Sequence, residues 1–131
     1  MARTALPVVA SSLTAGVVAP AGTAIDQANG MNIPLASGAI PRIGTAHQLV
    51  LVVHMTAVGA HSVIVRAGAT PVPAFRGALG DLTVAETGTQ DVYITLEAAR
   101  FMQTDNSINV DFTAGSTGTI IPLLVAPSQG A

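Results

Sequence analysis

The sequence predicts an all-β protein, a single β-sandwich of about eight short strands that is jelly-roll-like or Greek-key. Short runs of β-branched and alternating apolar residues recur about every ten residues, and Gly, Pro, Asn and Asp separate them. No segment has the apolar spacing of a convincing amphipathic helix. With 131 residues, the chain is long enough for one domain and one core.

The two longest apolar runs lie next to each other, as QLVLVVHMT and HSVIVRA, with AVGA between them. They predict a β-hairpin over Gln48–Ala67 with Ala57–Ala60 as its loop, because Gly allows the backbone a tight turn. In that register Val52 lies opposite Val65, and both faces of the strand pair are apolar. A strand pair of this kind is expected to be covered on both sides.

The segment before this hairpin divides into a short arm and the start of the sandwich. Residues 1–21 are predicted to form an extended N-terminal arm or an edge strand, because Pro7 lacks the N–H that a central strand needs. Residues 22–131 are predicted to form the sandwich. Two strands are expected in the arm and one after it, at Thr4–Val9, Leu13–Val18 and Met31–Ala36, and Ser37–Thr45 is a loop.

After the hairpin, Gly68–Asp81 is predicted to be a long loop, since Pro and Gly interrupt it. A second hairpin is expected from Leu82–Glu86 and Asp91–Leu96. In its second strand Val92, Ile94 and Leu96 face inward while Asp91, Tyr93 and Thr95 face outward. The remaining strands are expected at Ala98–Gln103, Ser107–Phe112 and Thr119–Ala126.

Composition favours a protein that is partly enclosed by neighbours over a freely soluble one. Charged residues make up 9% of the chain, and its five cationic residues are all Arg. The net charge of −2 argues against binding nucleic acid, and four aromatic residues leave little for bases or sugars to stack on. The longest apolar run is far shorter than a membrane span. Without cysteine, the fold depends on packing.

Two sets of side chains could carry chemistry, but neither has the spacing of a catalytic or metal site. They are the histidines His47, His54 and His61 and the carboxylates Glu97, Asp105 and Asp111. The hairpin register brings His54 and His61 onto one face, but a metal site would need a third ligand. Turn and surface roles explain the carboxylates equally well. We therefore expect no enzyme activity, no metal and no cofactor.

Two groups of residues are candidates for contact with a partner protein. Phe75 and Leu79 flank Arg76 in the predicted long loop, and an Arg between apolar side chains is the composition of an interface anchor. Ordinary loop packing would explain the same residues. Arg3 and Leu6 lie in the predicted N-terminal arm, which could reach a neighbouring chain.

Four segments of the chain together carry a resemblance to a known family: AGTAIDQANGMNI, TAHQLVLVV, VRAGATPVPAFRGALGDLTV and LEAARFMQTDNSINVDFTAGSTGTI. From Ala21 onward the chain resembles the small head proteins, called minor capsid or decoration proteins, of tailed bacteriophages with high-GC hosts. The resemblance implies a β-rich module, often a homotrimer, on the outer surface of the capsid shell.

The function implied is that of a structural virion protein, a cement that binds the major capsid protein of the assembled shell and stabilises the head. Such a protein would be made in the host cytoplasm and would contact neither membrane nor nucleic acid. The alternative is a tail, fibre or host-binding adhesin module of the same virion. A glycan-binding adhesin needs aromatic platforms or clustered polar side chains, and the sequence shows neither.

Overall fold

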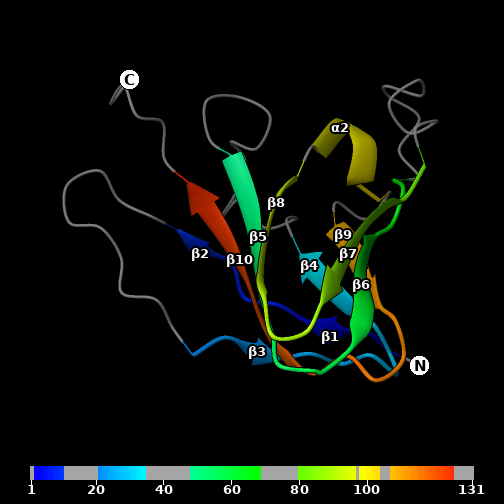
Figure 1. Cartoon of the computed structure of the whole chain (residues 1–131). Coiled ribbons are helices and arrows are strands. Elements are labelled where there is room, and N and C mark those ends of the chain that lie inside the picture. The colour runs from blue at the N-terminus through cyan, green and yellow to red at the C-terminus, as the bar shows by residue number, and fades with distance from the viewer. Residues whose placement is uncertain are drawn as a thin grey trace.

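A computed structural model describes residues 2–10, 21–34, 48–68, 80–96, 98–103 and 107–125. Within these residues the protein is essentially all-β, with strands in two sheets that pack face to face (Figure 1). The predicted all-β sandwich is therefore confirmed at the level of fold class.

Within the described residues each sheet has five strands. The first sheet has the order β1-β4-β9-β6-β7. Its strands are β1 (Thr4–Ala5), β4 (Met31–Pro34), β9 (Ser107–Phe112), β6 (Ala60–Val65) and β7 (Leu82–Thr87). The second sheet has the order β2-β10-β5-β8, and β3 also pairs with β10. Its strands are β2 (Val9–Ala10), β10 (Gly118–Val125), β5 (Gln48–Met55), β8 (Asp91–Leu96) and β3 (Thr23–Ala24).

The antiparallel pairs are nested along the chain. β6 pairs with β7, β5 with β8, β4 with β9 and β3 with β10. The chain therefore behaves as a ribbon of paired strands that is folded over, so that successive pairs fall in alternate sheets.

The hairpin predicted over Gln48–Ala67 is wrong, because β5 and β6 lie in different sheets. β5 pairs with β10 and β8, whereas β6 pairs with β7 and β9. The predicted pairing of Val52 with Val65 is replaced by Val52 with Ile121 and Tyr93. The physical reason is burial: when the chain crosses between the sheets, both strands place an apolar face in the same core.

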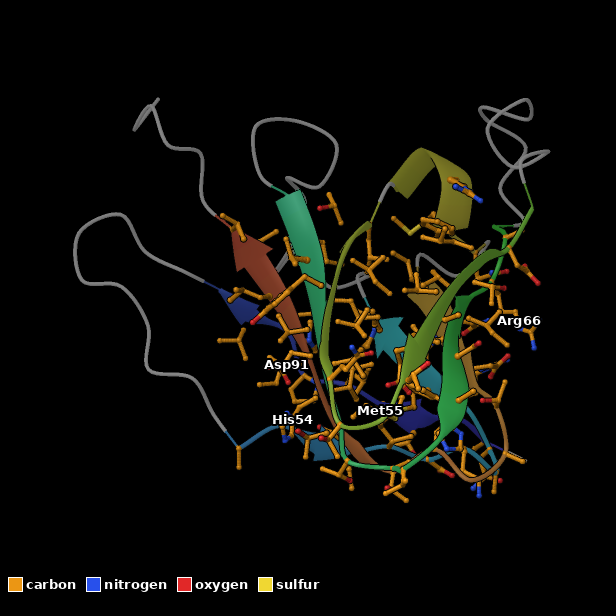
Figure 2. All side chains as sticks on the ribbon, in the orientation of Figure 1. His54, Met55, Arg66 and Asp91 are labelled. Carbon is orange, nitrogen blue, oxygen red and sulfur yellow. The ribbon has the colours of Figure 1, made fainter. Side chains whose placement is uncertain are left out.

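The second predicted hairpin fails in the same way, since β7 lies in the first sheet and β8 in the second. Its two strands are nevertheless where they were expected, and the alternation of Val92, Ile94 and Leu96 inward is confirmed. The two crossings lie side by side, because Gly88 N donates a hydrogen bond to Gly59 O at 2.9 Å. Both glycines have positive φ, 78° and 96°, which other residues adopt reluctantly. Met55 marks the end of β5 beside this corner (Figure 2).

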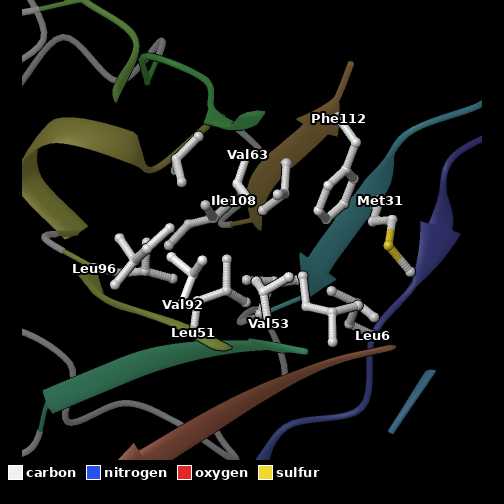
Figure 3. Close-up of a cluster of buried hydrophobic side chains, with 14 of the residues drawn as sticks. Leu6, Met31, Leu51, Val53, Val63, Val92, Leu96, Ile108 and Phe112 are labelled. Atoms are coloured by element: carbon white, nitrogen blue, oxygen red, sulfur yellow. The ribbon is translucent and has the colours of Figure 1, made fainter. Parts of the chain in front are cut away.

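The core fills the space between the two sheets (Figure 3). The second sheet contributes Leu51, Val53, Val92 and Leu96, and the first contributes Val63, Ile108 and Phe112, with Leu6 and Met31 beside them. These side chains alternate with outward residues along each strand, as the sequence pattern predicted for Ser107–Phe112.

A helical turn replaces the strand predicted at Ala98–Gln103. It is α2 (Ala98–Phe101), and it is too short to be stable alone. Phe101 is 1% exposed in the core, and Gly68 N donates to Arg100 O at 2.7 Å. The Arg100 guanidinium also donates to Gly80 O at 3.2 Å. Tertiary contacts therefore hold the turn, and the predicted strand is wrong because a helix too short to nucleate alone forms here through those contacts.

The N-terminal segment is an edge strand in both sheets. β1 pairs in parallel with β4, and β2 pairs in parallel with β10. Residues 2–10 are consequently part of the sandwich and not a separate arm. The expected strand at Leu13–Val18, the loop at Ser37–Thr45 and most of the loop at Gly68–Asp81 lie outside the described residues.

Truncation of a central core side chain tests this packing. Leu51 is fully buried between the sheets, so Leu51→Ala is expected to lower the free energy of unfolding by about 2–5 kcal/mol. Val58 is 86% exposed, and Val58→Ala should change it by less than about 0.5 kcal/mol. Urea unfolding measures both changes in the free energy of unfolding. Equal changes for the two variants would contradict the burial of Leu51 in the core.

Candidate functional site

The outer face of the second sheet is formed by residues that pair across β10, β5 and β8. Ile121 pairs with Val52 and Val52 with Tyr93, so these three side chains form one row. Leu123 and Val50 occupy the next row. We call these five residues the apolar outer face.

This face departs from the usual pattern of a sandwich, in which outward residues are polar. Val50, Val52, Ile121 and Leu123 are half-buried, although their inward neighbours on β5 are fully buried. Tyr93 is 69% exposed. The predicted apolar character of both faces of the β5 strand is therefore confirmed, but the outer one is only partly covered.

A shallow cleft adjoins the apolar outer face where β2 and β3 meet β10. Its volume is about 180 Å³, and Pro7, Val9, Thr23 and Ile121 are among its lining residues. The lining is predominantly apolar, so the cleft extends the apolar surface toward the N-terminal strand.

A histidine and an aspartate mark the polar end of the same face. His54 Nδ1 lies 2.5 Å from Asp91 Oδ1, and the two side chains are 59% and 50% exposed (Figure 2). Thr119 occupies the same row on β10. The pair could orient an imidazole for proton transfer, but no nucleophile bonds its other nitrogen within the described chain. This pair could not be predicted from the sequence, because 37 positions separate its members.

The predicted proximity of His54 and His61 is wrong, because the hairpin on which it depended does not form. His61 Nε2 instead lies 3.2 Å from Val58 O. His47 lies outside the described residues. In the part of the chain that the structure describes, no three His, Cys, Asp or Glu side chains gather as metal ligands. The same residues include no helix with the length and apolar character to cross a membrane.

The outer face of the first sheet has the opposite character. Asp111 on β9 accepts hydrogen bonds from Arg3 Nη1 and from Arg66 Nε, each at 2.5 Å, and Arg66 Nη1 donates to Asp81 at 2.9 Å. We call Arg3, Arg66, Asp81 and Asp111 the arginine–aspartate network. It connects the N-terminal segment to β9 and β6, so it stabilises the first sheet from outside.

The network lowers the pKa of its two carboxyl groups. Burial raises the pKa of Asp111, but hydrogen bonds from Arg3 and Arg66 outweigh this effect, and the net pKa is below its ordinary value. The backbone N–H of Ala67 and then the Arg66 guanidinium lower the pKa of Asp81. Both groups therefore remain ionised in the folded protein at neutral pH.

The predicted partner contacts occupy three kinds of position. Leu6 is fully buried in the core, so the prediction that it contacts another chain is corrected: the N-terminal strand needs it for packing. Arg3 is engaged with Asp111 in its own chain. Phe75, Arg76 and Leu79 lie outside the described residues. The sequence did not identify the apolar outer face as a separate surface, because only strand pairing separates it from the core.

The chain matches no protein-family model, no curated protein sequence and no solved structure.

Removing the carboxylate of Asp111 tests the network. A carboxyl group whose folded-state pKa is lowered stabilises the fold above its ordinary pKa of 3.8, and this contribution is lost as pH falls through the folded-state value. Asp111→Asn should lower the free energy of unfolding by about 1–3 kcal/mol at pH 7 and by much less near pH 2. Urea unfolding at both pH values measures the difference.

The matched control is Asp91→Asn, whose side chain is half exposed. It should change the free energy of unfolding by no more than about 1 kcal/mol at pH 7. A loss for Asp111→Asn that is equally large at both pH values would show that the carboxylate charge is not what stabilises the sheet.

Proposed function

We propose that this protein is a structural virion protein of a tailed bacteriophage. In this role it is a decoration protein that binds the major capsid protein on the outer surface of the assembled shell and stabilises the head. The observation that carries this role is the apolar outer face, a partly exposed β-surface that is suited to docking on another protein.

The distribution of charge supports docking through apolar contacts. Of the twelve charged residues, Arg3, Arg66, Asp81 and Asp111 are engaged with one another on the opposite sheet. Within the described residues, the outer face of the second sheet carries ionisable groups only at its His54 and Asp91 end and at the Tyr93 hydroxyl. Exposed ion pairs contribute about 0–1 kcal/mol each, whereas apolar burial contributes roughly 25 cal/mol per Å² before the costs of association.

This role requires no catalysis, metal or cofactor, and it places the protein on the virion surface after synthesis in the host cytoplasm. It involves no nucleic acid and no membrane. Self-association is part of the role. A tail, fibre or host-binding adhesin is the alternative, but a glycan platform would have to be built around the chain's single tyrosine, Tyr93.

Binding to undecorated heads tests this function. Purified protein should bind them at low and at molar salt and raise the temperature at which the shell ruptures, because apolar contacts resist screening. Bound copies are counted after sedimentation, and rupture is followed by calorimetry. Absence of binding at both salt concentrations would contradict the decoration role. Loss of binding in molar salt alone would contradict docking through apolar contacts.

Two lysine variants test which face docks. Val52→Lys places a charge in the middle of the apolar outer face, so binding should weaken by about tenfold or more. Thr83→Lys makes a matched change at an exposed outward position of β7 in the first sheet and should bind normally. Equal binding by both variants would exclude the apolar outer face as the docking surface.

A further inference from the structure

The four edges of the two sheets are not equally protected against pairing with another strand. β1 and β2 are two residues long, which leaves little to pair with. β7 carries Glu86, which is 6% exposed and has no hydrogen-bond partner within the described residues. An inward-pointing charge is a recognised protection of an edge strand, because extending the sheet would enclose it further.

β8 forms the other long edge and has no such protection. Its six residues include no Pro and no inward charge, since Val92, Ile94 and Leu96 face the core. Its one charged residue, Asp91, points outward. β8 is therefore the strand edge best suited to pairing among those the structure describes.

The hydrogen-bond pattern shows which backbone groups β8 presents. Met55 N donates to Gln90 O at 2.9 Å, and the β5–β8 register continues from this pair. Alternation along an antiparallel ladder directs the N–H and C=O groups of Val92, Ile94 and Leu96 to β5. The same groups of Asp91, Tyr93 and Thr95 point away from β5, and no described residue pairs with them.

We propose that a second copy of this chain pairs with β8 through its own β8, antiparallel and about a two-fold axis at Tyr93. In this register Asp91 lies opposite Thr95 of the partner subunit, and Tyr93 lies opposite the partner's Tyr93. The carboxylate thus faces a hydroxyl and not another carboxylate, and the two aromatic rings are neighbours. On the inner side Val92 lies opposite the partner's Ile94, so the apolar core continues across the contact.

The complementarity of β8 to a second β8 is the reason to favour a second copy over a different protein. All three outward residues, Asp91, Tyr93 and Thr95, find a compatible partner in one register, with no like charges opposed. The axis is perpendicular to the sheet, so both apolar outer faces point to the same side. The contact forms in solution without a capsid, and it gives dimers where the family resemblance implies trimers.

The mass of the protein in solution tests the contact. Wild-type protein should have twice the chain mass of 13.1 kDa by light scattering at micromolar to millimolar concentration. Tyr93→Lys alone and Tyr93→Glu alone place like charges opposite each other at the axis, and each should raise the dimer dissociation constant by about tenfold or more. Mixing the two variants should restore dimers, because the opposed charges then attract.

Two control variants distinguish loss of pairing at β8 from effects of any substitution at Tyr93 or of any added surface charge. Tyr93→Phe keeps the ring and should dimerise as wild type does. Val58→Lys adds a charge at the other large apolar side chain that is strongly exposed in the described chain, away from β8, and should not change the mass. Circular dichroism and thermal melting establish that each variant is folded.

Hydrogen exchange gives a second readout that does not depend on mass. The amide of Thr95 should be protected in the wild-type dimer and exchange rapidly in Tyr93→Lys. A wild-type mass of one or three chains, a Tyr93→Lys dimer as tight as wild type, or a Thr95 amide unprotected in a wild-type dimer would each overturn this pairing. Failure to bind heads would leave it intact, so the two proposals fail separately.

Discussion

Two strands in the middle of the second sheet are apolar on both faces, while a sandwich encloses only one face of each sheet. In β5 and β10 the inward residues Leu51 and Ile120 are buried almost completely. The outward residues Val52 and Ile121 are only partly covered by their neighbours. Both proposed contacts depend on this imbalance, because the described residues leave an apolar sheet face partly exposed.

The two sheets resolve the same problem in different ways. The first sheet covers its outer side with the arginine–aspartate network, in which Asp111 binds both Arg3 and Arg66. The ion pairs of that network hold the N-terminal strand against β9. The chain has few other charged residues. Within the residues that the structure describes, the outer face of the second sheet is only partly covered and the β8 edge is unpaired. Capsid docking and pairing through β8 are the two proposed ways of covering them, and they use adjoining parts of one sheet.

The sequence predicted some features well because they depend on neighbouring residues. The alternation in Ser107–Phe112 predicted both a strand and its inward face, and Val92, Ile94 and Leu96 did the same for β8. The sequence also predicted that both faces of β5 are apolar, but it predicted cover on both sides, whereas the outer face is only partly covered by the described residues. The pairing of β5 with β6 was predicted wrongly, since a short Gly-containing connection serves a hairpin and a crossing between sheets equally well.

The sequence by itself thus determined the all-β class, the positions of most strands and their inward faces, because side-chain alternation is a local property of a strand. Only the tertiary structure decided which strands are neighbours. Strand pairing places His54 next to Asp91 and Arg3 next to Asp111. The buried Phe101 holds Ala98–Phe101 as a helical turn. Each of these contacts joins residues far apart in the chain, and its free energy depends on burial and pairing that no single segment encodes.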